Sequence, residues 1–129
     1  MTPSLMLRLA ALWNFIGTGG ALFFVDLHFT TFYAVDVPQT AGVMLVHRTL
    51  WLIVGVLGLC YGIAASSLRY RDGILLVGTI GKTMVFVVWT VAVVQGVGTP
   101  LMFAGGAGDL VWAGYFVWLL RRPRRGHIL

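Results

Sequence analysis

Long apolar stretches, interrupted by short polar segments, run through almost the whole chain. The apolar stretches cover approximately residues 8–29, 43–66, 74–95 and 101–120. Each is long enough for a membrane-spanning helix, which needs about 20 mostly apolar residues. The pattern therefore predicts an all-α fold, an integral membrane four-helix bundle in which these stretches are the spans.

Three short connections join the predicted helices. Residues 30–40 and 67–73 contain polar and charged positions that interrupt the apolar pattern, and residues 95–100 form a tight glycine-containing turn. Thr99 followed by Pro100 is a typical N-cap and first-turn pair, so the last helix is expected to begin there. Four spans and three connections use nearly the whole chain.

The composition agrees with a chain that is surrounded by lipid. Of the 129 residues, 59% are hydrophobic and only 10% are charged, which is outside the usual balance of a water-soluble domain. We expect residues 1–129 to form a single transmembrane domain whose first partner is the lipid bilayer. The one cysteine, Cys60, lies within an apolar stretch, so no disulfide is expected within the chain.

The net charge of +5 comes mainly from arginines at the ends of the apolar stretches. Seven of them fall on one side of the predicted bundle, against Arg48 alone near the other side. Positive residues collect on the cytoplasmic side of a membrane, so the sequence predicts a multi-pass protein of the bacterial inner (plasma) membrane with both ends in the cytoplasm. Nucleic acid is not an expected partner. The seven are Arg8, Arg69, Arg71, Arg121, Arg122, Arg124 and Arg125.

The basic tail, residues 121–129, directly follows the last predicted span. Each basic residue beside an anionic leaflet contributes about 1 kcal/mol, so the tail arginines are expected to contact lipid headgroups. They are Arg121, Arg122, Arg124 and Arg125. Aromatic residues near the predicted helix ends are expected to anchor the helices at the membrane interface. These are Tyr33, Trp51, Tyr70 and Trp118.

Two charged residues lie within the apolar stretches, where a charge costs roughly 2.5–3.5 kcal/mol. Lys82 is in the third span and Asp109 in the fourth, at depths that differ by only a few ångströms at about 1.5 Å per residue. The sequence therefore predicts that they meet inside the bundle. A structural ion pair is favoured over a proton or ion relay, because one pair does not make a pathway.

A second group of polar residues is expected near the outer side of the membrane. It consists of Asp26, His28, His47 and Arg48. Asp26 and Arg48 form a candidate ion pair, although a packing seam with a snorkelling arginine is the favoured interpretation. Two histidines from neighbouring helices can ligate haem or a metal, but no third ligand completes a metal shell. Interfacial histidines are favoured, and no metal site is expected.

Small and polar residues within the spans predict the faces through which the helices pack. Asn14 is expected to form an interhelical hydrogen bond rather than to act as a catalytic group. Glycines allow close approach of two helices, and Gly58 and Gly62 form a GxxxG motif. The glycines expected at packing faces are Gly55, Gly58, Gly62, Gly78 and Gly105.

Short motifs occur in all four spans: Asn14, Gly58-x-x-Tyr61, Gly81-Lys82, and Gly108-Asp109-Leu110 with Phe116. With these motifs the chain resembles a loose group of small four-span bacterial membrane proteins, mostly without an assigned function, and more distantly the DoxX-like membrane proteins. The resemblance implies a four-helix membrane fold and an accessory role beside membrane redox enzymes.

No set of a nucleophile and a base is visible, and no glycine-rich phosphate loop follows a strand. The sequence therefore predicts a non-enzymatic accessory or interaction protein without a cofactor. Its expected partners are other membrane protein chains, as a subunit of a larger complex or as a homo-oligomer. Two alternatives remain open: a small transporter or proton-conducting protein that uses Lys82 and Asp109, and a lipid- or quinone-linked redox component.

Overall fold

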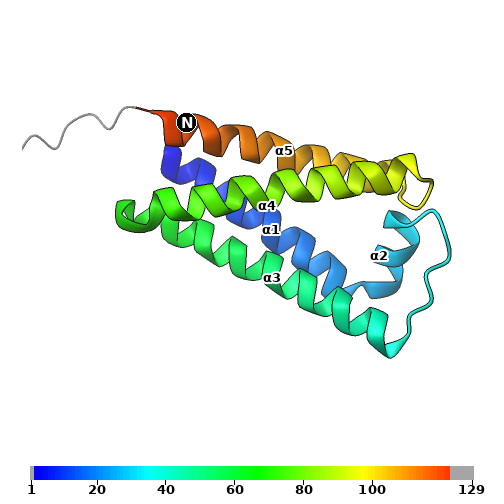
Figure 1. The fold of residues 1–129 in the computed structure, drawn as a ribbon. Helices are drawn as coiled ribbons and strands as arrows, with labels where there is room; N and C mark the ends of the chain where they lie inside the picture. Colours follow the sequence, from blue (N-terminus) through cyan, green and yellow to red (C-terminus); the bar gives the residue numbers. More distant parts are fainter. Residues whose placement is uncertain (1, 123–129) are drawn as a thin grey trace, which may run out of the picture.

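The computed structural model describes residues 2–122, and within them the chain is built from helices. Four of the helices are long and apolar enough to cross a membrane, which confirms the predicted all-α bundle (Figure 1). The exception is the short helix α2. The bounds are α1 (Pro3–Phe23), α2 (Val25–Phe32), α3 (Ala41–Ser66), α4 (Leu68–Val94) and α5 (Pro100–Arg121). The predicted headgroup contacts of Arg124 and Arg125 lie outside the described residues.

The first predicted span, residues 8–29, is two helices instead of one. Helix α1 begins already at Pro3, because the Thr2 hydroxyl accepts a hydrogen bond from the backbone N–H of Leu5 at 3.3 Å and caps the first turn. Phe24 then interrupts the helix with φ −120° and ψ 54°, and α2 starts at the next residue. The interruption changes the direction of the chain at the end of α1.

The second predicted connection, residues 67–73, is shorter than the sequence indicates. Only Ser67 is extended, with φ −130° and ψ 117°, and the residues after it form the first turns of α4. Two hydrogen bonds satisfy carbonyl groups at the end of α3: Ser67 N–H donates to Ile63 at 2.9 Å, and Arg71 Nε donates to Ala64 at 3.2 Å. The charged residues of this segment therefore lie on a helix.

The turn between α4 and α5 is tied to the end of α2. Gly96 adopts a φ of 75°, a left-handed conformation that favours glycine. Ala34 N–H donates to the Val97 carbonyl at 2.8 Å, and the Thr99 hydroxyl donates to the Thr31 carbonyl at 2.5 Å. Thr99 thus occupies the predicted N-cap position of α5, but its side chain binds α2 instead of capping the helix.

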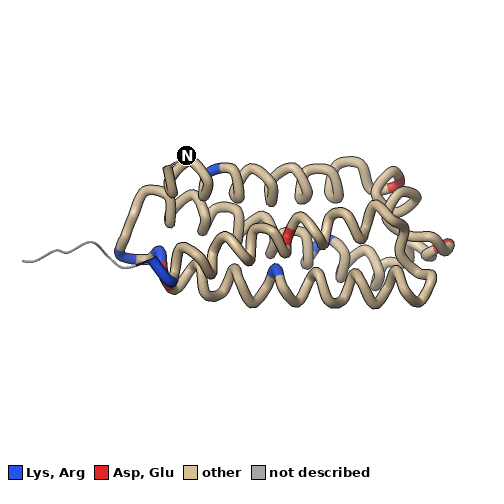
Figure 2. Tube along the Cα trace, turned by 90° about the horizontal axis from the view of Figure 1, so that it is seen from above, with Lys and Arg blue, Asp and Glu red and all other residues tan. Residues whose placement is uncertain are grey.

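The four long helices form two closely packed pairs, α1 with α3 and α4 with α5. The pairs lie close together at the end of the bundle where the chain begins, and diverge toward α2 (Figure 1). The end where they converge is filled by buried side chains, and we call it the arginine-rich end because basic residues gather there (Figure 2). Its core consists of Leu7, Ala10, Ala11, Tyr61, Ala64, Ala65, Leu75 and Phe116. The opposite end, which α2 partly closes, is the α2 end.

Candidate functional site

Lys82 and Asp109 meet between α4 and α5, the two helices of one closely packed pair. The Lys82 ammonium lies 2.5 Å from Asp109 Oδ1, and the two side chains are only 6% and 14% exposed. Matching depths along the two spans was enough to anticipate this contact. Lys82 is near the middle of α4 and Asp109 near the middle of α5, so the ion pair lies away from the ends of both helices.

Asn14 of α1 is the second hydrogen-bond partner of Lys82. Its Oδ1 accepts a hydrogen bond from the Lys82 ammonium at 2.9 Å, and its Nδ2 donates to the backbone carbonyl of Val54 in α3 at 2.9 Å. The second contact orients the amide, so that its oxygen faces the cation. Asn14 therefore links the α1–α3 pair to the α4–α5 pair, a role beyond the simple interhelical hydrogen bond that the sequence predicts.

Trp13, the neighbour of Asn14, binds the other member of the ion pair. Its indole Nε1 donates a hydrogen bond to Asp109 Oδ1 at 3.0 Å. The indole lies directly against Gly108, where an added Cβ would be 2.6 Å from Trp13 Cζ2. Sequence reasoning missed this residue, because a tryptophan within a span gives no sign of which helix it faces. The one sequence signal is the Gly108-Asp109 pair, because a glycine beside the aspartate leaves space for an aromatic ring to lie against the helix.

Tyr61 completes the surroundings of Lys82 from α3. The Lys82 nitrogen lies 5.6 Å from the centroid of the Tyr61 ring, within the range of a cation–π interaction. Tyr61 is fully buried and packs against Gly78, where a Cβ would be 2.7 Å from the tyrosine hydroxyl. All four long helices thus contribute a side chain around the ion pair. We call these residues the polar cluster: Trp13, Asn14, Tyr61, Lys82 and Asp109.

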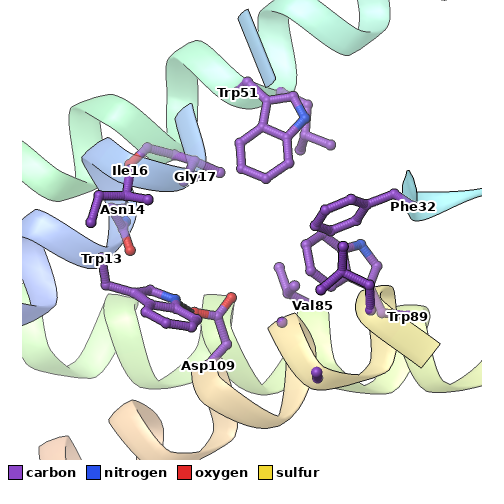
Figure 3. Close-up of a pocket in the computed structure, with 14 residues that line it drawn as sticks. Trp13, Asn14, Ile16, Gly17, Phe32, Trp51, Val85, Trp89 and Asp109 are labelled. Carbon is purple, nitrogen blue, oxygen red and sulfur yellow. Dashed lines mark hydrogen bonds between the residues drawn. The ribbon is translucent and has the colours of Figure 1, made fainter. Parts of the chain in front are cut away.

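Only one of the two carboxylate oxygens of Asp109 takes part in these contacts. Trp13 and Lys82 both donate to Oδ1, and within residues 2–122 no hydrogen bond is formed by Oδ2. Figure 3 shows the Asp109 side chain directed into a cavity that separates the two helix pairs. The open oxygen is therefore a hydrogen-bond acceptor at the wall of that cavity.

This central cavity has a volume of about 300 Å³ and mostly apolar walls. Its polar wall is supplied by Asn14 and Asp109, and its aromatic wall by four side chains drawn in Figure 3. Two of them lie against glycines: a Cβ on Gly17 would be 3.1 Å from the ring of Trp51, and a Cβ on Gly105 would be 2.9 Å from that of Trp89. The aromatic residues are Trp13, Phe32, Trp51 and Trp89.

A second cavity, of about 340 Å³, lies next to the first at the α2 end. The two cavities share four lining residues: Phe32, Leu50, Trp51 and Trp89. The rings of Phe32 and Trp89 meet edge to face with centroids 5.6 Å apart, and those of Trp51 and Trp89 are 6.3 Å apart. An aromatic layer therefore separates the α2-side cavity from the polar cluster.

His28 and His47 line the α2-side cavity, with ring centroids 5.2 Å apart. Burial, together with the neighbouring His47, lowers the pKa of His28 from 6.5 to about 4. His28 stacks on Phe32 at 4.3 Å, and an Nε2 contact of 3.0 Å joins His47 to the Ala21 carbonyl. Within residues 2–122, no three His, Cys, Asp or Glu side chains gather into a metal site.

The other two residues of the predicted outer cluster lie apart from the histidines. Asp26 accepts a hydrogen bond from Gln39 Nε2 at 3.1 Å. Arg48 is exposed and forms no ion pair with any described carboxylate, so the candidate pair with Asp26 is not formed. Asp26 is on α2 and Arg48 is on α3, and both are exposed, whereas the two histidines are buried.

The glycines expected at packing faces behave in two ways. Gly55 and Gly58 lie against α1, where a Cβ would be 3.2 Å from Thr18 and from Asn14. Gly78 and Gly105 lie against the aromatic residues described above. An added Cβ at Gly62, in contrast, would meet nothing within 4 Å among residues 2–122, so only one half of its GxxxG motif packs on another described helix.

The two tryptophans predicted at the membrane interface differ in their exposure. Trp51 is 7% exposed, because it turns inward and forms part of the aromatic layer, so its predicted place at the lipid interface is wrong. Trp118 is 46% exposed, and the centroid of its ring lies 3.7 Å from Cζ of Arg122 at the arginine-rich end. The difference depends on which way each helix is rotated.

Comparisons with protein-family models, with curated proteins and with solved structures find no match for this chain. The class of protein is therefore defined by the fold and the site themselves. It is a small, helical, multi-pass membrane protein with a charged cluster and an adjoining apolar cavity between its two helix pairs.

Proposed function

We propose that this chain binds a small lipophilic molecule in the central cavity. The observation that carries the proposal is the arrangement of that cavity, in which apolar walls converge on the two polar side chains of Asn14 and Asp109. Ligand sites commonly combine mostly apolar walls, a volume of about 300–1,000 Å³ and a few convergent polar groups. The proposal is for binding, and it includes no chemical reaction.

The packing of the arginine-rich end favours binding over conduction. Four large side chains in that half, Leu7, Tyr61, Leu75 and Phe116, have less than 2% of their surface exposed. A proton or ion relay needs polar groups along the whole path, and this part of the described bundle has an apolar core there. Both cavities lie on the α2 side of the polar cluster, as expected for a binding site.

A cavity-filling substitution tests the proposal. Val85 lines the central cavity, whereas Val87 on the same helix is 47% exposed and lines neither cavity. The protein is placed in phosphatidylcholine nanodiscs, and binding of 2-methoxynaphthalene is measured by equilibrium dialysis. After the uptake by empty nanodiscs is subtracted, the wild type should show saturable binding. Val85→Phe should weaken it about tenfold or more, and Val87→Phe should leave it unchanged. Absence of saturable binding, or equal effects of the two substitutions, would contradict the proposal.

A second candidate is the accessory role, as a subunit of a larger membrane complex or as a homo-oligomer. It is supported by glycines of the long helices at which an added Cβ would meet no other described atom within 4 Å. Small residues on a lipid-facing surface favour helix association in membranes. Examples are Gly62 of α3, Gly81 of α4 and Gly114 of α5. Native mass spectrometry of the tagged protein from its own membranes should then show a co-purifying chain or oligomer, and a partnerless monomer would argue against it.

The proposed setting is a bacterial inner membrane with both chain ends in the cytoplasm. The support comes from the arginines, which carry most of the positive charge of the described chain to one end of the bundle (Figure 2). In this orientation the α2 end and the α2-side cavity face the outer leaflet. The central cavity then lies on the outer-leaflet side of the polar cluster.

A further inference from the structure

We infer that the ligand of the central cavity is a neutral, flat lipophilic molecule with a hydroxyl group that donates a hydrogen bond to Oδ2 of Asp109. The inference rests on the proposed function and specifies the chemistry of the molecule bound. Three features of the site support it: its charge balance, its open polar atom and the shape of its walls.

The charge balance selects a neutral ligand. Lys82 and Asp109 form an ion pair, so the polar cluster carries no net charge. The rest of the cavity is lined by uncharged side chains, and none of the described residues there can neutralise an additional ion. Burying an unpaired charge in apolar surroundings is strongly unfavourable. A charged ligand would therefore bind much more weakly than a neutral one of the same size.

The open polar atom selects a hydrogen-bond donor. The single indole N–H of Trp13 is directed to Asp109, and the amide of Asn14 contacts Lys82 with its oxygen and Val54 with its nitrogen. This leaves Asp109 Oδ2, which forms no hydrogen bond in the described chain and can only accept one. A hydroxyl group can donate a hydrogen bond to this oxygen. An ether or ketone oxygen has no hydrogen to donate, so it cannot form this bond.

The walls select a flat molecule. Trp13, Phe32, Trp51 and Trp89 line the cavity, and large aromatic side chains pack favourably against flat ring systems. A volume of about 300 Å³ accommodates one or two fused rings in addition to the hydroxyl group. The ligand class is thus a phenol-like or otherwise hydroxylated ring compound that partitions into membranes.

Two probes of matched shape test the hydroxyl requirement. In phosphatidylcholine nanodiscs, the wild type should bind 2-naphthol about tenfold or more tightly than 2-methoxynaphthalene, after correction for partitioning into empty nanodiscs. This factor corresponds to one hydrogen bond to a charged acceptor. Equal affinities would overturn the inference and leave the proposed function standing. Saturable binding of neither probe would refute both.

A double substitution tests the role of Asp109 itself. Lys82→Met combined with Asp109→Leu removes both charges together and also removes the acceptor oxygen, so that no charge is left unpaired in the bundle. The preference for 2-naphthol should disappear, while 2-methoxynaphthalene should bind as in the wild type, which also demonstrates that the cavity is intact. Asp36→Leu, in the exposed connection after α2, is the matched control and should retain the preference. A preference that survives the double substitution would exclude Asp109 as the acceptor.

Discussion

Lys82 has a partner on each of the other three long helices. Asp109 supplies the opposite charge, Asn14 a carbonyl oxygen and Tyr61 an aromatic face. Desolvation makes an isolated buried ammonium strongly unfavourable, so these contacts depend on one another. Asn14 acts on this group through its own link to Val54. The cluster is therefore expected to respond to substitution as a unit.

Removing one member of the ion pair should destabilise the protein by about 3–5 kcal/mol, because the partner is left as a buried unpaired charge. Lys82→Met and Asp109→Leu are the two single substitutions, and the double substitution should recover much of the loss. The free energy of unfolding in detergent micelles measures this coupling. Additive losses would mean that the two side chains are not coupled.

Two glycines of α5 should respond in opposite ways to alanine. At Gly108 a Cβ would be 2.6 Å from Trp13, so the indole has to move and its hydrogen bond to Asp109 is lost. We expect Gly108→Ala to destabilise the protein by about 1–3 kcal/mol. An added Cβ at Gly114 would meet no described atom within 4 Å, so Gly114→Ala should be neutral or stabilise by up to about 1 kcal/mol. Thermal unfolding of the two variants side by side distinguishes them; equal melting temperatures would count against the Trp13 contact.

At the scale of the elements, α2 is the part that sequence periodicity did not separate from its neighbour. Apolar residues continue from α1 into α2. The residue at the interruption is Phe24, and not a glycine or a proline, which are the usual signals of a helix break. The long helices were predicted because each is apolar over its full length, which is a local property. The position of α2 depends instead on hydrogen bonds with the turn before α5, about 65 residues further along the chain.

The pKa of His28 predicts how this end of the molecule responds to acid. His28 has a pKa of about 4 in the folded protein against an ordinary value of 6.5. Above pH 6.5 it is neutral in both states, so its contribution to stability is complete. As the pH falls from 6.5 to 4, only the unfolded state takes up the proton, and the folded state loses about 1–3 kcal/mol.

Thermal unfolding in detergent at pH 7.5, 5.5 and 4.5 measures this loss. His28→Phe, which retains a ring against Phe32, should show a smaller decrease in melting temperature over the same range. Since the other titrating groups are common to both proteins, the difference between them isolates His28. The same decrease in both proteins would show that His28 is not responsible.

At the scale of the whole molecule, the two helix pairs meet at the arginine-rich end and separate toward α2 (Figure 1). The packed half gives the bundle its core, and the open half contains both cavities. One chain therefore combines a packed core at one end with two cavities toward the other. The orientation of this arrangement in the membrane decides from which leaflet the cavities are reached.

Cysteine labelling tests the orientation. In a Cys60→Ala background, Asp36→Cys and Tyr70→Cys place single thiols at exposed positions on opposite ends of the bundle. A membrane-impermeant maleimide should label Asp36→Cys in intact cells and Tyr70→Cys only after lysis, because the arginine-rich end is expected in the cytoplasm. The reverse pattern would place the α2 end in the cytoplasm.

The sequence by itself determined the number of spans, the end where the arginines gather and the depth of Lys82 and Asp109. These properties follow from the transfer of each segment from water to lipid, which depends on local composition and length. Only the tertiary structure decided that Trp13 and Tyr61 join the ion pair, that Trp51 turns inward and that Gly62 packs on no other helix of the described chain. Those outcomes depend on the rotation and tilt of each helix about its neighbours, which packing between distant parts of the chain determines.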